Sequence, residues 1–508
     1  KAGTDPEYVN ADWYRASIRQ FAPQQNHNLS ISGGTDKIKY YGYFGYNRQE
    51  TQFKFDGGNY DRFNFQVNFD AKVTSQINVG MNLQYMRDIK NYPSGGDLYQ
   101  DGVNFWRDII YGADPRYPLY LPDRSLLSYA NIQNGSPLWA VDINKSGYHR
   151  TTRNNMKFTG FVEYNFKYVK GLKLKANILF TSNNSYLKWM HKRGEFYTYE
   201  IGVDQYVFAR NSVAPSSLTE SYGTDNNIVQ QYSINYDREF NGHNISVLAM
   251  YESTLDKNTS FNTSIEGFDT TIIEEMMAGD EETAKNNSSS INYGRRSFIG
   301  RVDYNYKDKY MVEAIVRADA SSRFAKGYRW GVFPSVSVGW NIAKEDFMSN
   351  ADFVDNLKIR ASFGESGYDA VASFNYLTGY KYNLLNTFGE DMYNGLVSTG
   401  LANELLTWEQ MYIANIGVDF SFFDRKLYGE FDMFQRDRKG IPGYRYQSLP
   451  NTFGATLPQE NLNAIQTRGF ELRLGTSGSA GAFIYDVSAN ISYNRSIWTK
   501  YDQAPETD

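Results

Sequence analysis

Hydrophobic and polar residues alternate one by one along most of the chain. Between Ile77 and Tyr85, every second residue is Ile, Val, Met, Leu or Tyr, and those between are Asn, Gly or Gln. Because successive side chains of a β-strand point to opposite faces, such a segment has one apolar and one polar face. The alternation recurs over almost the whole sequence and predicts about sixteen strands. Their apolar faces lie in residues 29–31, 40–46, 63–69, 77–85, 158–168, 172–180, 228–236, 245–251, 298–306, 310–318, 332–340, 357–363, 412–420, 427–433, 470–474 and 483–493.

The segments between the predicted strands are alternately short and long. Short connections are expected at residues 33–36, 169–171, 240–242, 307–309 and 423–426, with 341–356 as a longer member of this set. Long connections are expected at residues 88–154, 185–225, 256–296, 365–407 and 439–466. A soluble sandwich can share the residue alternation, but its combination with these loop lengths is typical of a membrane β-barrel. We therefore predict an all-β protein, a large antiparallel transmembrane barrel with short periplasmic turns and long extracellular loops.

The loop lengths also give the direction of the strands. The first connection is short and hence periplasmic, so the first strand runs inward from the outside. Complete barrels of this class normally begin with a strand running outward, so at least one strand is expected before Lys1. The sixteenth strand ends outside, and no closing strand follows it. We expect the chain to be part of a longer protein whose signal peptide lies outside the sequence.

The composition suits a barrel better than a helical membrane protein. The mean hydropathy of the 508 residues is −0.58, and no run of 18 or more apolar residues is present. Transmembrane helices need such runs, whereas barrel strands hide their hydrophobicity by alternation. Aromatic residues make up 16%, with 42 Tyr and 33 Phe. That content fits the aromatic girdles at the two edges of a membrane.

The net charge and the content of reactive residues exclude or disfavour several kinds of partner and site. The formal charge is −5 without a basic tract, which disfavours nucleic acid as a partner. The chain has no cysteine, so disulfides, thiolate metal sites and a Cys nucleophile are excluded. The four histidines have no metal-ligand spacing, and no phosphate-binding glycine loop or G-x-S-x-G motif is present. We expect no enzyme activity, no metal and no cofactor.

Several stretches resemble the SusC/RagA-type TonB-dependent outer-membrane transporters. The most specific of them is Tyr310–Trp340. Further matches are Ala11–Arg19, Gln25–Gly34, Leu357–Gly367, Asn415–Phe420 and Leu427–Asp432. The resemblance spans nearly the whole chain. It implies that residues 1–508 form a partial receptor-type barrel, with about 16 strands of a probable 22 and with the plug domain outside this chain.

The resemblance also implies a function and partners. Family members import oligosaccharides or peptides across the outer membrane of Gram-negative bacteria. A SusD-like surface lipoprotein lies as a lid on the extracellular loops. The inner-membrane TonB complex provides the work that displaces the plug. The expected partners are therefore this lipoprotein, the TonB complex acting through the missing plug region, membrane lipid and the ligand itself.

Aromatic residues of the long loops are the candidate ligand contacts. Aromatic faces suit the C–H faces of sugars, and their polar edges suit hydroxyl groups. The loop at residues 88–154 is the richest in aromatic side chains, and the next long loop, at residues 185–225, adds Trp189. The candidates are Tyr99, Trp106, Tyr111, Trp139 and Trp189. For any single ring, packing within the loop or against the lipoprotein is the more common role.

An acidic loop and two other function classes complete the hypotheses. The residues Glu274, Glu275, Asp280, Glu281 and Glu282 share one long loop, and a solvated loop face is favoured over a cation site. A structural or adhesive barrel subunit of a larger surface or secretion assembly is the alternative to an importer. A soluble all-β carbohydrate-active enzyme is a third reading, which partition into water without detergent would favour.

Overall fold

Sixteen long strands form one antiparallel sheet. The computed structural model describes residues 9–95, 103–133, 135–212, 214–388, 391–445 and 457–502, together with 452, 454 and 455. The strands are β1 (Gln24–Gly34), β2 (Ile38–Glu50), β3 (Asn59–Lys72), β4 (Ile77–Pro93), β6 (Gly147–Asn165), β7 (Leu172–His191), β10 (Ser217–Phe240), β11 (His243–Glu266), β12 (Lys285–Tyr306), β13 (Tyr310–Ser321), β14 (Trp330–Asn341), β15 (Val354–Tyr368), β18 (Glu409–Phe422), β19 (Leu427–Tyr444), β20 (Gln459–Ala480) and β21 (Phe483–Lys500). Each pairs with the next in this order, so the predicted sixteen strands and their antiparallel arrangement are confirmed.

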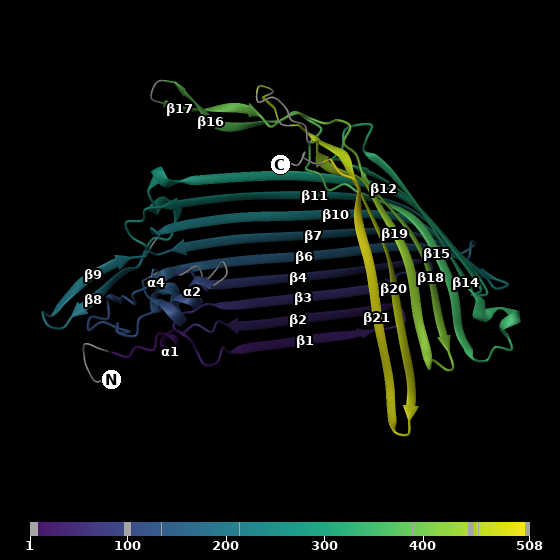
Figure 1. The fold of residues 1–508 in the computed structure, drawn as a ribbon, viewed down its shortest axis with the longest axis horizontal. Coiled ribbons are helices and arrows are strands. Elements are labelled where there is room, and N and C mark those ends of the chain that lie inside the picture. The colour runs from purple at the N-terminus through teal and green to yellow at the C-terminus, as the bar shows by residue number, and fades with distance from the viewer. Residues whose placement is uncertain are drawn as a thin grey trace, which may run out of the picture.

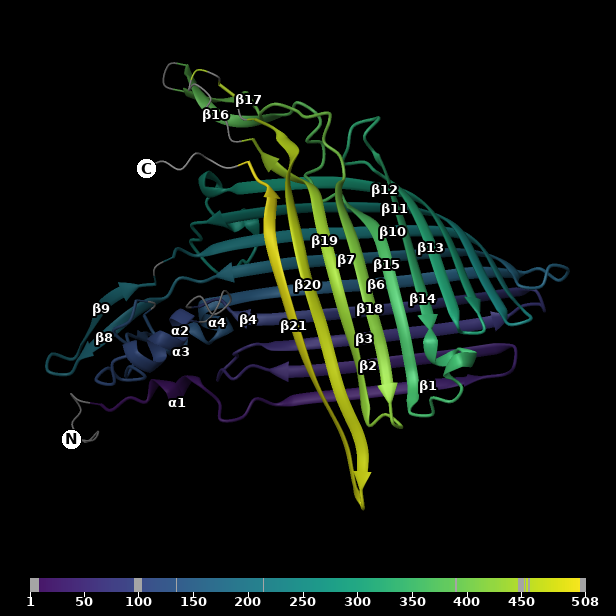
Figure 2. The same ribbon diagram turned by 45° about the vertical axis from the view of Figure 1, so that its right-hand side comes forward.

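The sheet is strongly curved. The strands β1 to β12 lie side by side, and the sheet then turns, so that β19 to β21 run across the view of the first strands (Figures 1 and 2). Curvature and strand tilt of this kind are what closure into a barrel requires. Among the described residues, no helix is long and apolar enough to cross a membrane.

The two faces of the sheet differ as the alternation predicts. On one face, Phe65 and Tyr85 stand in register on neighbouring strands and are both exposed. On the other face of the same strands, the side-chain amide of Asn82 donates to Asn68 at 2.5 Å. Large exposed hydrophobic side chains continue along the apolar face from Leu29 on β1 to Ile491 on β21. An apolar outer face and a polar inner face are the arrangement of a transmembrane barrel.

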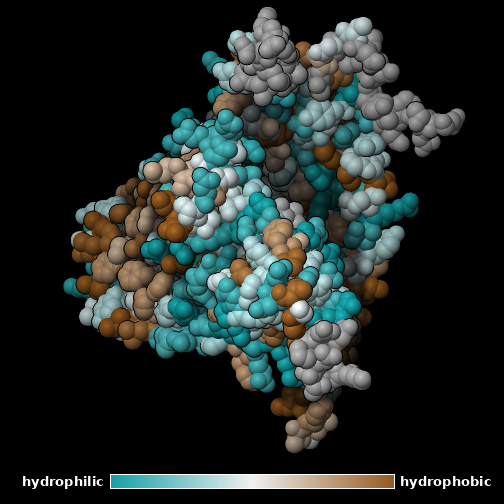
Figure 3. All heavy atoms as spheres, turned by 90° about the vertical axis from the view of Figure 1, so that its left-hand side faces the viewer, coloured by the Kyte–Doolittle hydropathy of each residue, from teal (hydrophilic) through white to brown (hydrophobic). Residues whose placement is uncertain are grey.

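The two ends of the sheet carry connections of different length. The turn end has the connections 35–37, 73–76, 166–171, 241–242, 307–309, 342–353, 423–426 and 481–482. The loop end has the connections 51–58, 94–146, 192–216, 267–284, 322–329, 369–408 and 445–458. Seen from the loop end, hydrophobic side chains gather along one flank of the molecule, and hydrophilic side chains dominate the loops (Figure 3).

The long loops are shorter than the sequence predicted, because the strands continue beyond the apolar band. The predicted loops 185–225 and 256–296 are reduced to 192–216 and 267–284. Strands β10 and β11 stay paired from Ser217 and Glu266 to the turn end. Past the membrane, neither face needs to be apolar, so the alternation fades while the backbone hydrogen-bond ladder continues.

The loops contain small elements of their own. The helices are α1 (Trp13–Ser17), α2 (Val103–Arg107), α3 (Pro137–Ala140), α4 (Ile143–Ser146), the π-helix η2 (Asp108–Gly112) and the 3₁₀ turns η3 (Met276–Ala278), η4 (Glu281–Thr283), η5 (Ile342–Lys344) and η6 (Asp346–Met348). The short strands β5 (Leu127–Ser128), β8 (Glu195–Glu200) and β9 (Gln205–Asn211) form a second sheet. The strands β16 (Tyr380–Phe388) and β17 (Asp391–Ser398) form a separate hairpin that stands away from the main sheet (Figures 1 and 2). The buried hydrophobic side chains lie mainly at the loop end.

Candidate functional site

A folded cap covers the loop end beside the first strands. We use the word cap for the described residues within 94–146 and 192–212, which contain α2 to α4 and the three-stranded sheet. Helix α1 lies against it, and the indole Nε1 of Trp13 donates to the carbonyl oxygen of Asp114 at 3.1 Å. The cap core also contains Phe105, Ile132 and Phe196, each less than 9% exposed. This buried core gives the cap a fixed shape.

Trp139 is part of the cap core. It lies on α3, whose first residue Pro137 has a φ that suits the start of a helix. The Trp139 side chain is 2% exposed, and its Nε1 donates to the carbonyl oxygen of Lys145 at 3.1 Å. Its ring lies edge-on to His191 and Phe196, with centroids 5.9 and 5.6 Å away. Neither face of this indole is open to a ligand in this arrangement.

Trp189 lies on a strand rather than in a loop, which corrects the prediction. It belongs to the outer part of β7, on the polar side of the wall, and its Nε1 donates to Ser94 Oγ at 2.7 Å. Ser94 Oγ also lies 3.1 Å from His191 Nδ1. The Trp189 ring is 5.5 Å from that of His149, which is 1% exposed. Burial lowers the pKa of His149 to about 4, so this imidazole is neutral at pH 7.

Trp106 and Tyr111 lie close together in sequence on the surface of the cap. Trp106 on α2 is partly buried against Phe105 and Phe53, with ring centroids 5.4 and 6.5 Å away. Tyr111 on η2 is 85% exposed, the most open of the described candidates. Tyr99 lies outside the described residues. The structure thus groups Trp139 with Trp189 around His191, and places Trp106 and Tyr111 at the surface.

One residue of the acidic loop, Glu274, holds the loop to Tyr148 and Lys192, and we call this contact the latch. Lys192 Nζ lies 2.8 Å from Glu274 Oε1, and the Tyr148 hydroxyl donates to Glu274 Oε2 at 2.8 Å. Lys188 Nζ lies 3.2 Å from Glu275 Oε1. Burial would raise the pKa of Glu274, but the hydrogen bonds from Lys192 and Tyr148 outweigh it and lower the pKa. The predicted solvated face is therefore wrong for the half-buried Glu274 and is confirmed for Glu275, Asp280, Glu281 and Glu282, which are exposed.

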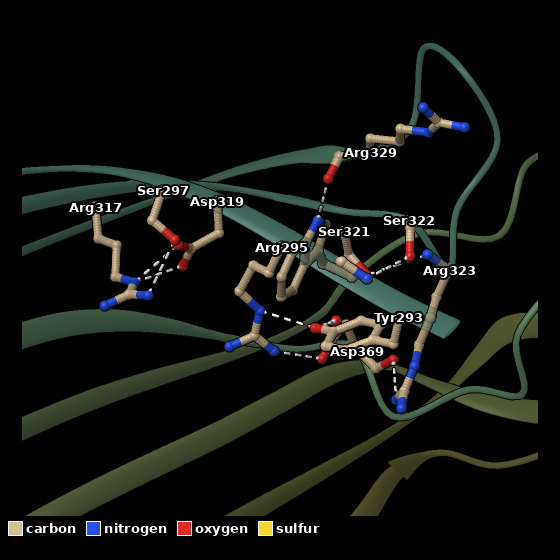
Figure 4. A network of polar contacts seen from close by, with 12 residues as sticks. Tyr293, Arg295, Ser297, Arg317, Asp319, Ser321, Ser322, Arg323, Arg329 and Asp369 are labelled. Atoms are coloured by element: carbon tan, nitrogen blue, oxygen red, sulfur yellow. Dashed lines mark hydrogen bonds and ion pairs between the residues drawn. The ribbon is translucent and has the colours of Figure 1, made fainter. Parts of the chain in front are cut away.

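A buried ion-pair network forms a second feature of the loop end, on the polar face of β12 to β15 (Figure 4). Its centre is Asp369, which is 5% exposed. The carboxylate accepts from the Tyr293 hydroxyl at 2.6 Å and from Arg295 Nη2 at 2.8 Å. Arg323 donates to the backbone oxygen of Asp369 at 3.1 Å. Burial alone would raise the pKa of Asp369, but the hydrogen bonds and positive charges around it outweigh burial and lower this pKa. For Tyr293, burial and the hydrogen bond to Asp369 both raise the pKa, to about 12.

The network continues along β13. Arg317 Nε donates to both carboxylate oxygens of Asp319 at 2.8 Å. Its Nη2 donates to Glu252 Oε1 and to Ser297 Oγ, each at 3.1 Å. Three neighbouring strands are thus tied together by one guanidinium, a geometry that suits arginine rather than lysine.

An apolar cluster lies beside the network and completes what we call the anchor, meaning residues 293–297, 317–333, 369 and 408. Phe324, Phe333 and Trp408 are buried at 0, 5 and 5% exposure. The Phe333 ring fits because Gly331 and Gly367 have no Cβ where the ring lies. Trp408 Nε1 donates to the backbone oxygen of Arg329 at 2.8 Å.

The anchor holds both ends of the loop 369–408. Asp369 begins this loop and Trp408 ends it, and each contacts the short loop 322–329. The end is held from the other side as well, because the Thr407 amide donates to Asn461 on β20 at 3.0 Å. The hairpin β16–β17 therefore projects from a fixed base.

The sequence did not single out the anchor as a site. Asp319, Ser321, Arg323 and Phe333 all fall within Tyr310–Trp340, the segment that carries the most specific family resemblance. The signal that could have identified them is the break in alternation at Ser321 and Ser322, where strand residues give way to a polar run. No sequence pattern identifies Asp369, because its partners lie 46 to 76 residues away in sequence.

The polar face nearer the turn end is charged and hollowed. Arg360 on β15 contacts Asp419 at 3.1 Å and Asp432 at 2.5 Å across two further strands. A pocket of about 770 Å³ lies beside it, lined among others by Glu313, Ser337 and Lys358. Among the described residues, no three His, Asp or Glu side chains are grouped to hold a metal ion.

The comparisons with known proteins agree with the fold. The family model "TonB dependent receptor-like, beta-barrel" matches residues 123–508. The TonB-dependent receptor P3 of Formosa agariphila is 26% identical over 97% of this chain and 47% of its own length. The TonB-dependent receptor SusC of Bacteroides thetaiotaomicron is 25% identical over 100% of this chain and 50% of its own length.

Solved structures resemble the chain in the same way. The structure of the RagAB peptide transporter matches with a TM-score of 0.74 and 21% identity, over 97% of this chain and 52% of the matched one. The RagAB peptide importer in its closed-closed state matches with a TM-score of 0.76 and 20% identity, over 98% and 53%. The chain therefore spans about half the length of the proteins it matches. The chain belongs to the TonB-dependent receptor family, as part of its β-barrel, and it is similar to SusC and to the RagAB structures.

Proposed function

We propose that the chain is the barrel wall of an importer that takes up oligosaccharides or peptides together with a SusD-like surface lipoprotein. The observation that carries this proposal is the loop end. Its cap and its anchored loop have buried cores and ion pairs, so they present fixed surfaces above a polar, charged interior. A structured mouth of this kind suits the binding and transfer of a ligand, for which loops on a rigid scaffold are the common solution.

Two partners have a place in this scheme. The SusD-like lipoprotein lies over the loop end, where the cap and the hairpin β16–β17 offer exposed side chains such as Tyr382, at 78% exposure. The TonB complex acts from the inner membrane through a plug inside the barrel. The charged polar face around Arg360 and Asp432 is the wall that such a plug and a passing ligand would meet.

Tyr111 and Trp106 are the ligand contacts that we propose on the cap. Tyr111 has an open ring, and Trp106 is held at one side by Phe105. Trp139 and Trp189 then act as supports, because their indole groups are engaged within the cap. Tyr99 stays a candidate on sequence grounds alone.

The test is ligand uptake by cells that carry the complete protein. Labelled oligosaccharide and peptide mixtures are supplied with and without an uncoupler of the proton gradient. We expect uptake of one class, dependent on the gradient. The replacement Tyr111→Ala should weaken it by about two- to tenfold, the loss of one aromatic contact.

The matched control is Tyr168→Ala, because Tyr168 is 92% exposed in the turn 166–171 at the opposite end. It should leave uptake unchanged. Uptake of neither class, with a normal amount of folded barrel in the outer membrane, would contradict the importer proposal and favour a structural or adhesive subunit. Equal losses of uptake in both variants would contradict the proposed ligand contact of Tyr111, but not the importer proposal.

A further inference from the structure

The apolar face of the wall is hollowed across its middle strands. A pocket of about 760 Å³ opens there across β6, β7, β10, β11, β12 and β13. Its floor is made of the small residues Ala176, Ala249 and Gly300. Exposed side chains such as Val162 and Tyr232 form its sides. We call this pocket the outer groove.

Aromatic rings border the outer groove towards the loop end. Tyr232 and Tyr251 stack with centroids 6.4 Å apart, and Tyr251 lies 5.3 Å from Phe298. Phe298 then stacks on Trp330 at 6.0 Å. Aromatic rings concentrate where the hydrocarbon of a membrane meets its headgroups. The groove thus opens into the hydrocarbon, and the headgroups of the outer leaflet lie just beyond this row of rings.

A cation without a protein partner lies just beyond the rings. Arg296 is exposed and precedes Phe298 by two residues on the same face of β12. It stands in register with Ser253 on β11 and Ala320 on β13, and Ala320 is paired in turn with Trp330. Among the described residues, none forms a hydrogen bond or ion pair with the side chain of Arg296. The adjacent Arg295 points to the other face, where it is bonded to Asp369.

The charge around Arg296 has one sign. Lys257 follows Ser253 by four residues on the same face of β11 and is also exposed. The residues of this face between and beside the two cations are Gln230, Ile228, Asn226, Ser253, Leu255, Asn292, Gly294 and Ala320, and none is acidic. The nearest acidic residues of β11, Glu252 and Asp256, lie on the opposite face, because they alternate with these positions. Glu220 on β10 shares the face with Asn226, but it lies six residues further towards the loop end and pairs with Lys188.

From this arrangement we infer that the outer groove and Arg296 form a binding site for a phosphate-bearing lipid of the outer leaflet, with an acyl chain in the groove and a phosphate on Arg296 and Lys257. An apolar hollow that faces hydrocarbon is filled by acyl chains, because an empty one forfeits dispersion contacts. A guanidinium at headgroup level binds phosphate through two parallel hydrogen bonds. The inference concerns the outside of the wall and is independent of what the barrel imports.

The test uses the complete protein, purified in mild detergent and stripped of native lipid. It is titrated with phosphorylated lipid A and, separately, with the same lipid after removal of its phosphates, and bound lipid is counted by native mass spectrometry. We expect the phosphorylated form to bind about tenfold more tightly, as one charge-assisted contact implies. The double replacement Arg296→Gln and Lys257→Gln should remove this preference.

Two further variants separate the two halves of the site. Ala249→Leu fills the groove with an apolar side chain that the membrane tolerates, and it should weaken both lipids alike. Arg238→Gln is the matched control, since Arg238 is an exposed cation on the same face at the turn end. Its replacement should change neither titration.

Three results would overturn the inference. The double variant could keep the wild-type preference for phosphate. Arg238→Gln could reduce binding as much as the double variant, which would mean general attraction to cations. Cysteine cross-linking at the groove could join two copies of the protein, which would make a second copy its occupant.

Discussion

The anchor gives the sharpest prediction about the mouth of the barrel, and Asp369→Asn is the change that tests it. The asparagine has nearly the same shape, but it removes the charge that faces Arg295 and one of the acceptors for Tyr293. Loss of one partner from a fully buried ion pair costs about 3–5 kcal/mol. The Arg295 side chain is 33% exposed, so solvent offsets part of that cost, and about 2 kcal/mol is expected.

The predicted effect is local, because Asp369 holds the loop 369–408 rather than the sheet. Opening of the loop base should become easier by about 2 kcal/mol, which raises hydrogen exchange of its amides by about 30-fold. The assay is hydrogen exchange with mass spectrometry on the complete protein in detergent. Peptides from β13 and β14 should exchange as in the wild type. The control is Glu404→Gln, an exposed position in the same loop.

Unchanged exchange in the loop 369–408 of Asp369→Asn would refute the reasoning, because the network would then contribute nothing to holding the loop. Faster exchange throughout the sheet would refute it in a different way, since the carboxylate would then stabilise the barrel and not the loop base.

Three further predictions address the wall, His149 and the latch. Val67→Arg on the apolar face should lower folding stability in bilayers by about 2–4 kcal/mol if it lies near the midplane, whereas Gln66→Arg on the polar face should cost much less. Equal costs in refolding titrations would contradict the assignment of faces. The pKa of His149 on β6 is lowered to about 4, so the unfolded chain binds more protons than the folded one between that value and about 6.5. The folded state should therefore lose up to about 3 kcal/mol of stability as pH falls through this range. His149→Phe should abolish this dependence in thermal melts of the complete protein, and an unchanged slope would count against it. The lowered pKa of Glu274 means that the latch contributes its full stability above the ordinary value near 4.5 and loses it as pH falls through the lowered one. Proteolysis of the loop 267–284 should therefore rise as pH falls through the lowered pKa of Glu274, and Glu274→Gln should show the same cleavage already at pH 7.

The strand pattern could be predicted from sequence because one physical constraint repeats at every strand. Each strand that crosses the membrane must be apolar on one side, so segments such as Ile77–Tyr85 identify themselves without any long-range information. The constraint ends where the strand leaves the hydrocarbon. For this reason the sequence predicts a loop for the outer part of β7, which contains Trp189, although the backbone pairing of this strand continues to His191.

The loop end could be predicted only in outline. An abundance of aromatic residues in a long loop indicates ligand binding or packing, but it does not show which rings are buried. In the structure Trp139 is buried in the cap core, whereas the Tyr111 side chain is exposed. Asp369 and Glu274 meet their partners through the pairing of strands that are distant in sequence. No local sequence pattern predicts these ion pairs, because each partner by itself is an ordinary charged residue of a loop or strand.

The central claim is that this barrel works as an importer with a surface lipoprotein. The most direct measurement is extraction of the native complex from its outer membrane in mild detergent, with the co-purifying chains identified and counted by mass spectrometry. We expect one SusD-like lipoprotein for each barrel. A barrel recovered alone, or within a large assembly that lacks such a lipoprotein, would contradict it.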